Sequence, residues 1–198
     1  MLGSVRTYAY VGPQLDARRW IEAVGEGRSF MTNGPLVELR INQRMPGEEI
    51  HFPPEGGNLE VECSVWSIFP LTRAVIHHNG KVWKELPLNP DRLSATFRTS
   101  AKIADSGWFS LAVEGERVAG SSDPSYPQAV SNPIRVYVGD RKIRSKESAQ
   151  YFITWIDKLR KMAEAHPGWR SESEKAKVFT HFEKAKAVYT QRAAEAAH

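Results

Sequence analysis

The sequence predicts a mainly β protein with α: a β-sandwich of antiparallel strands, preceded by a short strand-helix segment and followed by an antiparallel helix pair. Between residues 35 and 139, short runs of period two alternate with turn residues about every ten positions, which is typical of a sandwich of roughly seven strands. Before this region, Leu15–Val24 carries apolar residues at helical spacing. After Gly139 the apolar period becomes helical again.

The N-terminal segment alternates along Val5–Val11, and both faces are apolar enough for a strand buried on two sides. Gly12-Pro13 ends that strand. The helix over Leu15–Val24 has Asp16 as its expected N-cap, because a short acidic side chain can accept from the free backbone N–H groups of the first turn.

Residues 27–35 form the junction between this helix and the β region. Gly27 suits the end of a helix, and Asn33–Pro35 is a turn, because Asn and Gly tolerate positive φ and Pro bars helix continuation. Residues 29–32 are then an extended connector, with Arg28 as the one strong cation. Backbone geometry explains most of this pattern, and Arg28 and Asn33 are also candidate binding residues.

The Asn79-Gly80 pair lies between two extended runs and predicts a hairpin, since both turn positions favour positive φ. Asn132-Pro133 predicts a bulge or an edge position near the start of the last strand. The predicted strands of the sandwich are Leu36–Ile41, Leu59–Ser67, Arg73–His78, Lys81–Leu86, Leu93–Thr99, Trp108–Glu114 and Val130–Val138.

Two amphipathic helices follow. Ser145 is the expected N-cap of the first, and residues 166–168, His-Pro-Gly, end it. Ser171 and Glu174 form a capping-box pattern at the start of the second. A short loop between two such helices predicts an antiparallel pair, and we expect its remaining apolar face to pack on the sandwich.

Composition narrows the class of protein. The net charge of +4 suggests nucleic acid, yet Lys and Arg are dispersed, and the densest run, residues 140–146, is predicted to be a solvated linker. We therefore expect no nucleic-acid partner. No apolar run is long enough for a membrane span, so we expect no membrane partner and a cytoplasmic location. The lone Cys63 lies in an apolar strand pattern and is expected to be a buried thiol.

Few residues suggest chemistry. His77 and His78 are adjacent in a predicted strand, so their side chains point to opposite faces and cannot easily share a metal. We expect no metal, no other cofactor and no catalytic residue, and we interpret the two histidines as exposed hairpin residues that are candidates for binding. Trp66 and Trp83 could flank an open sheet face that stacks on sugars.

Several stretches carry a family resemblance: "SVRTYAYV" followed by "GRSFMTNGPL", then "SGWFSLAVEG", "SNPIRVYVGDRKI" and "SAQYFITWIDKL". In this order they resemble the C-terminal region of PHP-type metallohydrolases of the carbaryl-hydrolase-like group. The resemblance implies the end of a metal-binding barrel, an immunoglobulin-like β-domain and C-terminal helices. That family hydrolyses ester or phosphoester bonds with metal-activated water. Its ligands precede the "VRTY" strand, so we expect this chain to lack them.

The resemblance divides the chain into three regions. Residues 1–34 are a strand-helix remnant of the barrel, residues 35–139 the sandwich, and residues 140–198 a helical hairpin packed on it. We expect a non-catalytic accessory or assembly module, whose partner is a PHP-type catalytic domain or a second copy of itself. A homodimer would use residues 5–24 in place of the missing barrel. The alternative is a free-standing carbohydrate- or peptide-binding sandwich.

Overall fold

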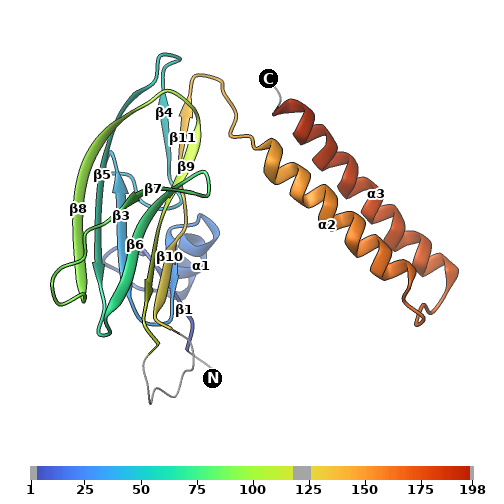
Figure 1. The fold of residues 1–198 in the computed structure, drawn as a ribbon, viewed down its shortest axis with the longest axis horizontal. Helices are drawn as coiled ribbons and strands as arrows, with labels where there is room; N and C mark the ends of the chain where they lie inside the picture. Colours follow the sequence, from blue (N-terminus) through green and yellow to red (C-terminus); the bar gives the residue numbers. More distant parts are fainter. Residues whose placement is uncertain (1–3, 118–125, 197–198) are drawn as a thin grey trace. The chain divides into compact units, whose positions relative to one another are not determined.

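The computed structural model describes residues 4–117 and 126–196. It contains two β-sheets of eight and three strands, a short helix near the N-terminus and two contacting helices at the C-terminus (Figure 1). The sheets do not close into a barrel in the part of the chain described. The chain divides into two compact units, Met1–Lys142 and Ile143–His198, which we call the β unit and the helix unit.

The larger sheet is organised around β9 (Gly107–Gly115). This strand pairs antiparallel with β10 and β11 and also with β6. The other strands extend the sheet from these neighbours: β1 (Arg6–Ala9), β2 (Ser29–Thr32), β4 (Glu49–Phe52), β6 (Leu71–His78), β7 (Lys81–Glu85), β10 (Gln128–Ser131) and β11 (Ile134–Val138).

One pairing in the larger sheet contradicts the prediction of antiparallel strands throughout. Strands β4 and β11 run parallel, with Glu49 opposite Arg135 and Phe52 opposite Val138. These strands are far apart in the chain and no hairpin joins them, so nothing forces their directions to be opposite.

The smaller sheet has the order β3 (Leu36–Ile41), β5 (Gly57–Trp66) and β8 (Ser94–Ile103), and it is antiparallel throughout. Strands β5 and β8 pair without a register shift from Gly57–Ile103 to Trp66–Ser94. Every second residue of β5 points to the inside, so Leu59, Val61 and Val65 are almost fully buried.

The buried side chains of both sheets form one hydrophobic cluster. Phe109, Leu111 and Val113 enter it from β9, and each is at most 1% exposed. Full burial of one such side chain contributes about 1.5–3 kcal/mol relative to exposure. Cys63 belongs to the same cluster, and burial raises the pKa of its thiol to about 12, so the prediction of a buried thiol is confirmed.

The predicted hairpin and helix caps are confirmed. Asn79 and Gly80 adopt φ angles of 51° and 80° between β6 and β7. Asp16 caps α1 (Ala17–Gly25) by accepting from the Arg19 N–H at 2.9 Å. The other two N-caps are Ser145 for α2 (Lys146–Glu164) and Ser171 for α3 (Glu172–Glu195).

Other predictions about the strands were wrong. The described residues form eleven strands, because β2 and β4 were missed and the run 130–138 is two strands. The break falls at Asn132-Pro133, where Pro cannot donate a backbone hydrogen bond. Strand β1 is mostly exposed rather than buried on two sides, because it lies at the edge of the larger sheet and pairs only with β2.

Within the helix unit, α2 and α3 are antiparallel, as predicted. Two cross-helix contacts show this: the Asp157–Lys186 ion pair at 2.7 Å and the Phe152–Tyr189 ring stack at 4.8 Å. The earlier residue of α2, Phe152, meets the later residue of α3, Tyr189, so the two helices run in opposite directions. Of the two helices, only α2 has fully buried residues, Ala149 and Ile156.

We predict that the helix unit is needed for stable folding of the chain. Tyr151, Trp155 and Met162 lie four and then seven residues apart on α2 and remain 61%, 44% and 61% exposed. Such a stripe needs a partner, and the prediction remains that the β unit provides it. A chain that ends before Ser145 should aggregate or lose cooperative thermal unfolding, measured by circular dichroism. A soluble truncated chain with an unchanged melting transition would show that the helices are an independent appendage.

Candidate functional site

The six candidate residues fall at separate places in the β unit, and only His78 and Trp83 meet at a shared contact. Arg28 and Asn33 flank β2, and Trp66 is the last residue of β5 in the smaller sheet. His78, at the C-terminal end of β6, and Trp83 of β7 face the core. His77 lies on the outer face of β6.

Arg28 joins α1 to the larger sheet. Its N–H donates to the Ala23 carbonyl at 2.8 Å, and its carbonyl accepts from the Tyr10 N–H at 2.9 Å. The guanidinium pairs with Glu26 at 2.6 Å, and its Nε is buried without a hydrogen-bond partner among the described residues. The backbone groups of Arg28 and its ion pair with Glu26 therefore serve the junction, which supports the interpretation by backbone geometry.

Asn33 ties the turn after β2 to the start of β10. Its Nδ2 donates to the Tyr126 carbonyl at 2.8 Å, and its Oδ1 accepts from the Gln128 N–H at 2.7 Å. The Asn33 N–H also donates to the Gln128 carbonyl at 3.1 Å. The side chain thus continues the β2–β10 ladder by one step, which gives Asn33 a structural role.

His78 and Trp83 both contact Phe109 in the core. The His78 ring stacks on Phe109 at 4.4 Å between centroids, and Trp83 meets the same ring edge-on at 5.4 Å. A Cβ on Gly107 would lie 2.3 Å from His78 Nε2, so the absence of a side chain at Gly107 makes room for the imidazole. His78 is therefore partly buried, with its ring packed on the core, and the expectation of an exposed hairpin histidine was wrong for it.

His77 points to the opposite face of β6, since adjacent side chains of a strand alternate. It lies opposite Ser110 on β9 and is partly exposed. The two histidines therefore cannot jointly bind one ion. Among residues 4–117 and 126–196, no three His, Cys, Asp or Glu side chains are grouped in a way that could hold a metal.

The environment of His78 favours its neutral form. Burial lowers the pKa of the imidazole below its ordinary value of 6.5, and the charge of Asp105 opposes this shift more weakly. His78 Nε2 is buried and has no hydrogen-bond partner within the described residues. A protonated ring would place two donors in this apolar contact with Phe109, which is unfavourable.

Trp66 lies on the outer face of the smaller sheet and is 49% exposed. Its cross-strand neighbour is Leu36, which is also exposed, at 42%. Trp83, by contrast, belongs to the larger sheet and packs against the shared core. The structure does not bring these two tryptophans to one sheet face.

The outer face of the larger sheet carries an apolar row that sequence reasoning missed. The register places Met31 of β2 opposite Val130 of β10, which lies opposite Ala112 of β9 and then Val75 of β6. Met31 is 53% and Val130 39% exposed, Ala112 is partly exposed, and Val75 is only 5% exposed. We call these four residues the outer apolar row.

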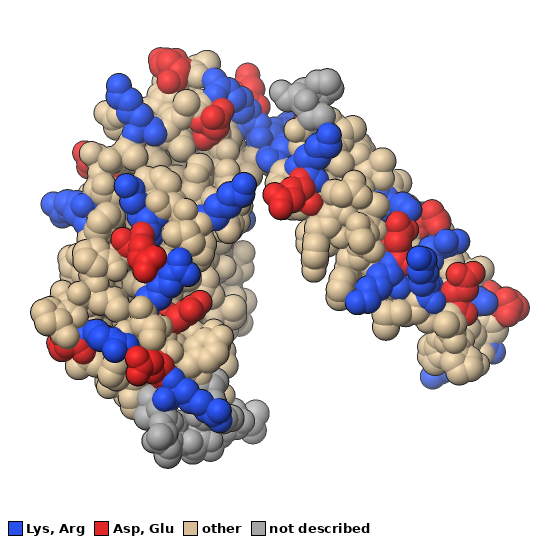
Figure 2. Space-filling view, viewed as in Figure 1, with Lys and Arg blue, Asp and Glu red and all other residues tan. Residues whose placement is uncertain are grey.

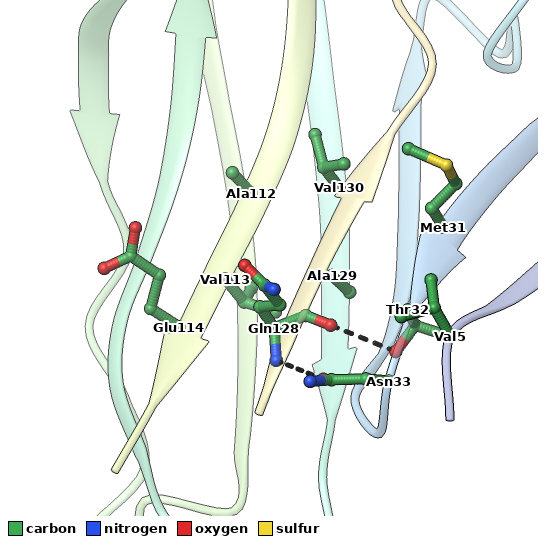
Figure 3. Close-up of a pocket in the computed structure, with 10 residues that line it drawn as sticks. All are labelled: Val5, Met31, Thr32, Asn33, Ala112, Val113, Glu114, Gln128, Ala129 and Val130. Atoms are coloured by element: carbon green, nitrogen blue, oxygen red, sulfur yellow. Dashed lines mark hydrogen bonds between the residues drawn. The ribbon is translucent and has the colours of Figure 1, made fainter. Parts of the chain in front are cut away.

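A shallow cavity of about 230 Å³ lies over Met31, Val130 and Ala112 of this row (Figure 3). Val5, Met31 and Val130 supply its exposed apolar lining, while Asn33 and Gln128, hydrogen-bonded to each other, lie at one end. The cavity presents little charge: among the described residues that line it, Glu114 is the only ionisable one. It suits an apolar side chain better than a polar ligand.

Helix α1 also leaves apolar surface open. Ala23 is its only buried residue, while Trp20 and Ile21 are 39% and 64% exposed. An amphipathic surface helix normally turns such residues toward a core. In the described part of the chain, Ala23 is the only residue of α1 that is buried in this way.

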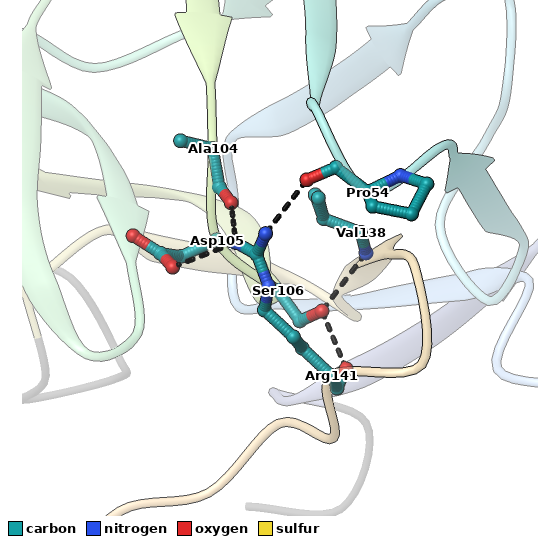
Figure 4. Close-up of polar contacts among 6 residues, drawn as sticks. All are labelled: Pro54, Ala104, Asp105, Ser106, Val138 and Arg141. Carbon is teal, nitrogen blue, oxygen red and sulfur yellow. Dashed lines mark hydrogen bonds and ion pairs between the residues drawn. The ribbon is translucent and has the colours of Figure 1, made fainter.

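Arg141 also has a role that the sequence did not reveal, because residues 140–146 were predicted to be a solvated linker. Its guanidinium donates to the carbonyls of Pro54, at 2.6 Å, and Ala104, and pairs with Asp105 at 3.2 Å (Figure 4). Ser106 Oγ donates to the Arg141 carbonyl at 2.5 Å and accepts from the Val138 N–H at 2.9 Å. These hydrogen bonds hold the chain after β11 against the loop at Pro54 and the loop of residues 104–106.

Comparison with known proteins gives no relative: neither a scan of protein-family models nor a search of curated proteins matched the chain. No helix among the described residues is long and apolar enough to span a membrane. On the face in Figure 2, basic and acidic side chains are interspersed over the β unit. The outer apolar row and α1 are two places in the β unit where apolar side chains are exposed.

We predict that His78 makes the stability of the chain sensitive to acid. A folded-state pKa below the unfolded value means that the unfolded chain binds the proton more readily. The stabilising contribution of neutral His78 is complete above pH 6.5 and is lost as the pH falls through the lower folded-state pKa. His78→Phe, which can still stack on Phe109, should reduce the loss of unfolding free energy between about pH 8 and pH 5.

Urea unfolding at both pH values measures this difference. His77→Gln is the matched control, because His77 lies on the other face of β6. The control should keep the acid sensitivity of the parent chain. Equal acid sensitivity in His78→Phe and the parent would assign the effect to other groups.

Proposed function

We propose that this chain is a non-catalytic accessory and assembly module, which docks a partner on the outer face of its larger sheet. The observation that carries the proposal is the outer apolar row. A sheet with one face in the core normally presents polar residues on the other, and here Met31, Val130 and Ala112 lie side by side on three paired strands and are at least partly exposed, while Val75 on the fourth strand is only 5% exposed. Apolar residues gathered on an exposed face mark interaction sites.

The elements beside the row support the same conclusion. Strand β1 is the edge of the sheet, and its residue Thr7 continues the row next to Met31. Val5, just before β1, is 61% exposed and lines the same cavity. Open backbone at a sheet edge, next to exposed apolar side chains, is a favourable place for another protein to bind.

The resemblance to PHP-type metallohydrolases suggests the partner. The words "VRTYAYV" and "GRSFMTNGP" contain β1 and β2, and in that family the helix between these words and the "GRSF-TNGP" turn close the catalytic barrel. We propose that a PHP-type catalytic domain packs on this face. In the same family the region that corresponds to residues 35–139 is an immunoglobulin-like sandwich. Two sheets that share one core are compatible with such a sandwich here. Any hydrolytic activity would belong to the partner.

A free-standing binding protein remains the second candidate. The exposed Trp66 beside Leu36 favours it, because an accessible indole on a sheet face can stack on a sugar ring. Its weakness is that Trp83 lies elsewhere, so a platform with two tryptophans is not formed.

The test is the effect of single charges in the outer apolar row on association. The full chain is mixed with a separately expressed PHP-type catalytic barrel, and complex formation is followed by sedimentation velocity. We expect a complex that Met31→Glu or Val130→Glu weakens by about tenfold or more, because a buried apolar side chain contributes more than about 1.4 kcal/mol.

Ile68→Glu is the matched control, since Ile68 is 79% exposed in the loop between β5 and β6, outside the row. It should leave the complex unchanged. The chain alone is measured in parallel, together with a form that starts at Arg28. A dimer of the full chain that this truncation or Met31→Glu dissociates would make a second copy the partner. A monomer that binds no barrel would contradict the proposal.

A further inference from the structure

The smaller sheet has an unusually long open edge. Strand β8 pairs with β5 on one side, and within the described residues no strand pairs with its other side (Figure 1). It has ten residues, whereas the other edge strands β1, β4, β7 and β3 have four, four, five and six. Its register with β5 contains no bulge, and its sequence contains no proline, so neither of these common protections of an edge is present.

The core-facing side chains of β8 are also incompletely covered. Phe97 and Ile103 pack against the core but remain partly exposed, and Thr99 and Ala101 between them are partly exposed as well. The equivalent residues of the central strand β5, such as Val61, are fully buried. One further strand beside β8 would complete their burial, with apolar residues at every second position.

The charges on β8 decide between possible occupants. Arg98 and Lys102 lie on the outer face, and the strand carries no acidic residue. Two copies of β8 paired edge to edge would bring only cations together, which is unfavourable. On the paired side, Arg98 instead meets Glu62 of β5 at 2.9 Å. A strand with glutamates on its outer face therefore complements β8, and a second β8 does not.

We propose that the β8 edge binds an extended acidic peptide by strand addition, with apolar residues facing the core and acidic residues facing Arg98 and Lys102. Backbone hydrogen bonds to the open edge would hold the peptide, and the alternating side chains would set its register. This surface is separate from the outer apolar row, which lies on the other sheet. The inference therefore does not depend on the proposed function.

The probe is a synthetic peptide as long as β8 in which valine alternates with glutamate, titrated into the isotope-labelled full chain. We expect saturable binding and slower hydrogen exchange at alternate amides of β8, whose N–H groups point to the open edge. A peptide with lysine in place of glutamate should bind at least about fivefold more weakly. A peptide N-methylated at alternate residues, which lacks the donors, should not bind.

Lys102→Glu should weaken binding of the glutamate peptide and strengthen binding of the lysine peptide. The matched control is Lys81→Glu at the edge strand β7, which should change neither. Three results would each overturn the proposal: no saturable binding, slower exchange at another strand edge instead of β8, or full protection of β8 before peptide is added. Sedimentation would then show whether a second copy causes that protection.

Discussion

The β unit depends on the placement of one strand, β9. It pairs with β6 along one side, and with β10 and β11 in succession along the other. Its inward residues Phe109, Leu111 and Val113 meet the smaller sheet in the shared core. Because both edges of β9 are paired with other strands and one face packs in the core, its neighbours have little freedom of register. The outer apolar row exists only because β9 fixes Ala112 between Val130 and Val75.

Glycine at the start of β9 connects this framework to His78, whose ring stacks on Phe109. Gly107 lies where a Cβ would collide with His78 Nε2 and approach the Asn79 amide. The Asn79 Oδ1 accepts from the Trp108 N–H at 3.0 Å, so the hairpin tip is anchored to the same end of β9. The hairpin turn, the small residue and the partly buried imidazole therefore form one packing arrangement, in which a change at any member would disturb the others.

Much of this fold could be predicted from the sequence, where local chemistry decides the structure. The Asn79-Gly80 turn and the caps Asp16, Ser145 and Ser171 depend only on neighbouring residues, and all four were predicted correctly. Strands β2 and β4 could not be found in this way. Each has four residues, too few for a period to stand out, and each is ordered by a partner distant in the chain.

The candidate surfaces show a deeper limit of the same reasoning. A period of two assigns each residue to one of two faces, but it does not tell which strands are neighbours. Met31, Val130, Ala112 and Val75 become a row only once the order β2–β10–β9–β6 is known. In the sequence each of them is a single apolar residue with an ordinary core explanation. An interaction surface on a sheet is therefore a property of strand order, and strand order is set by contacts between distant parts of the chain.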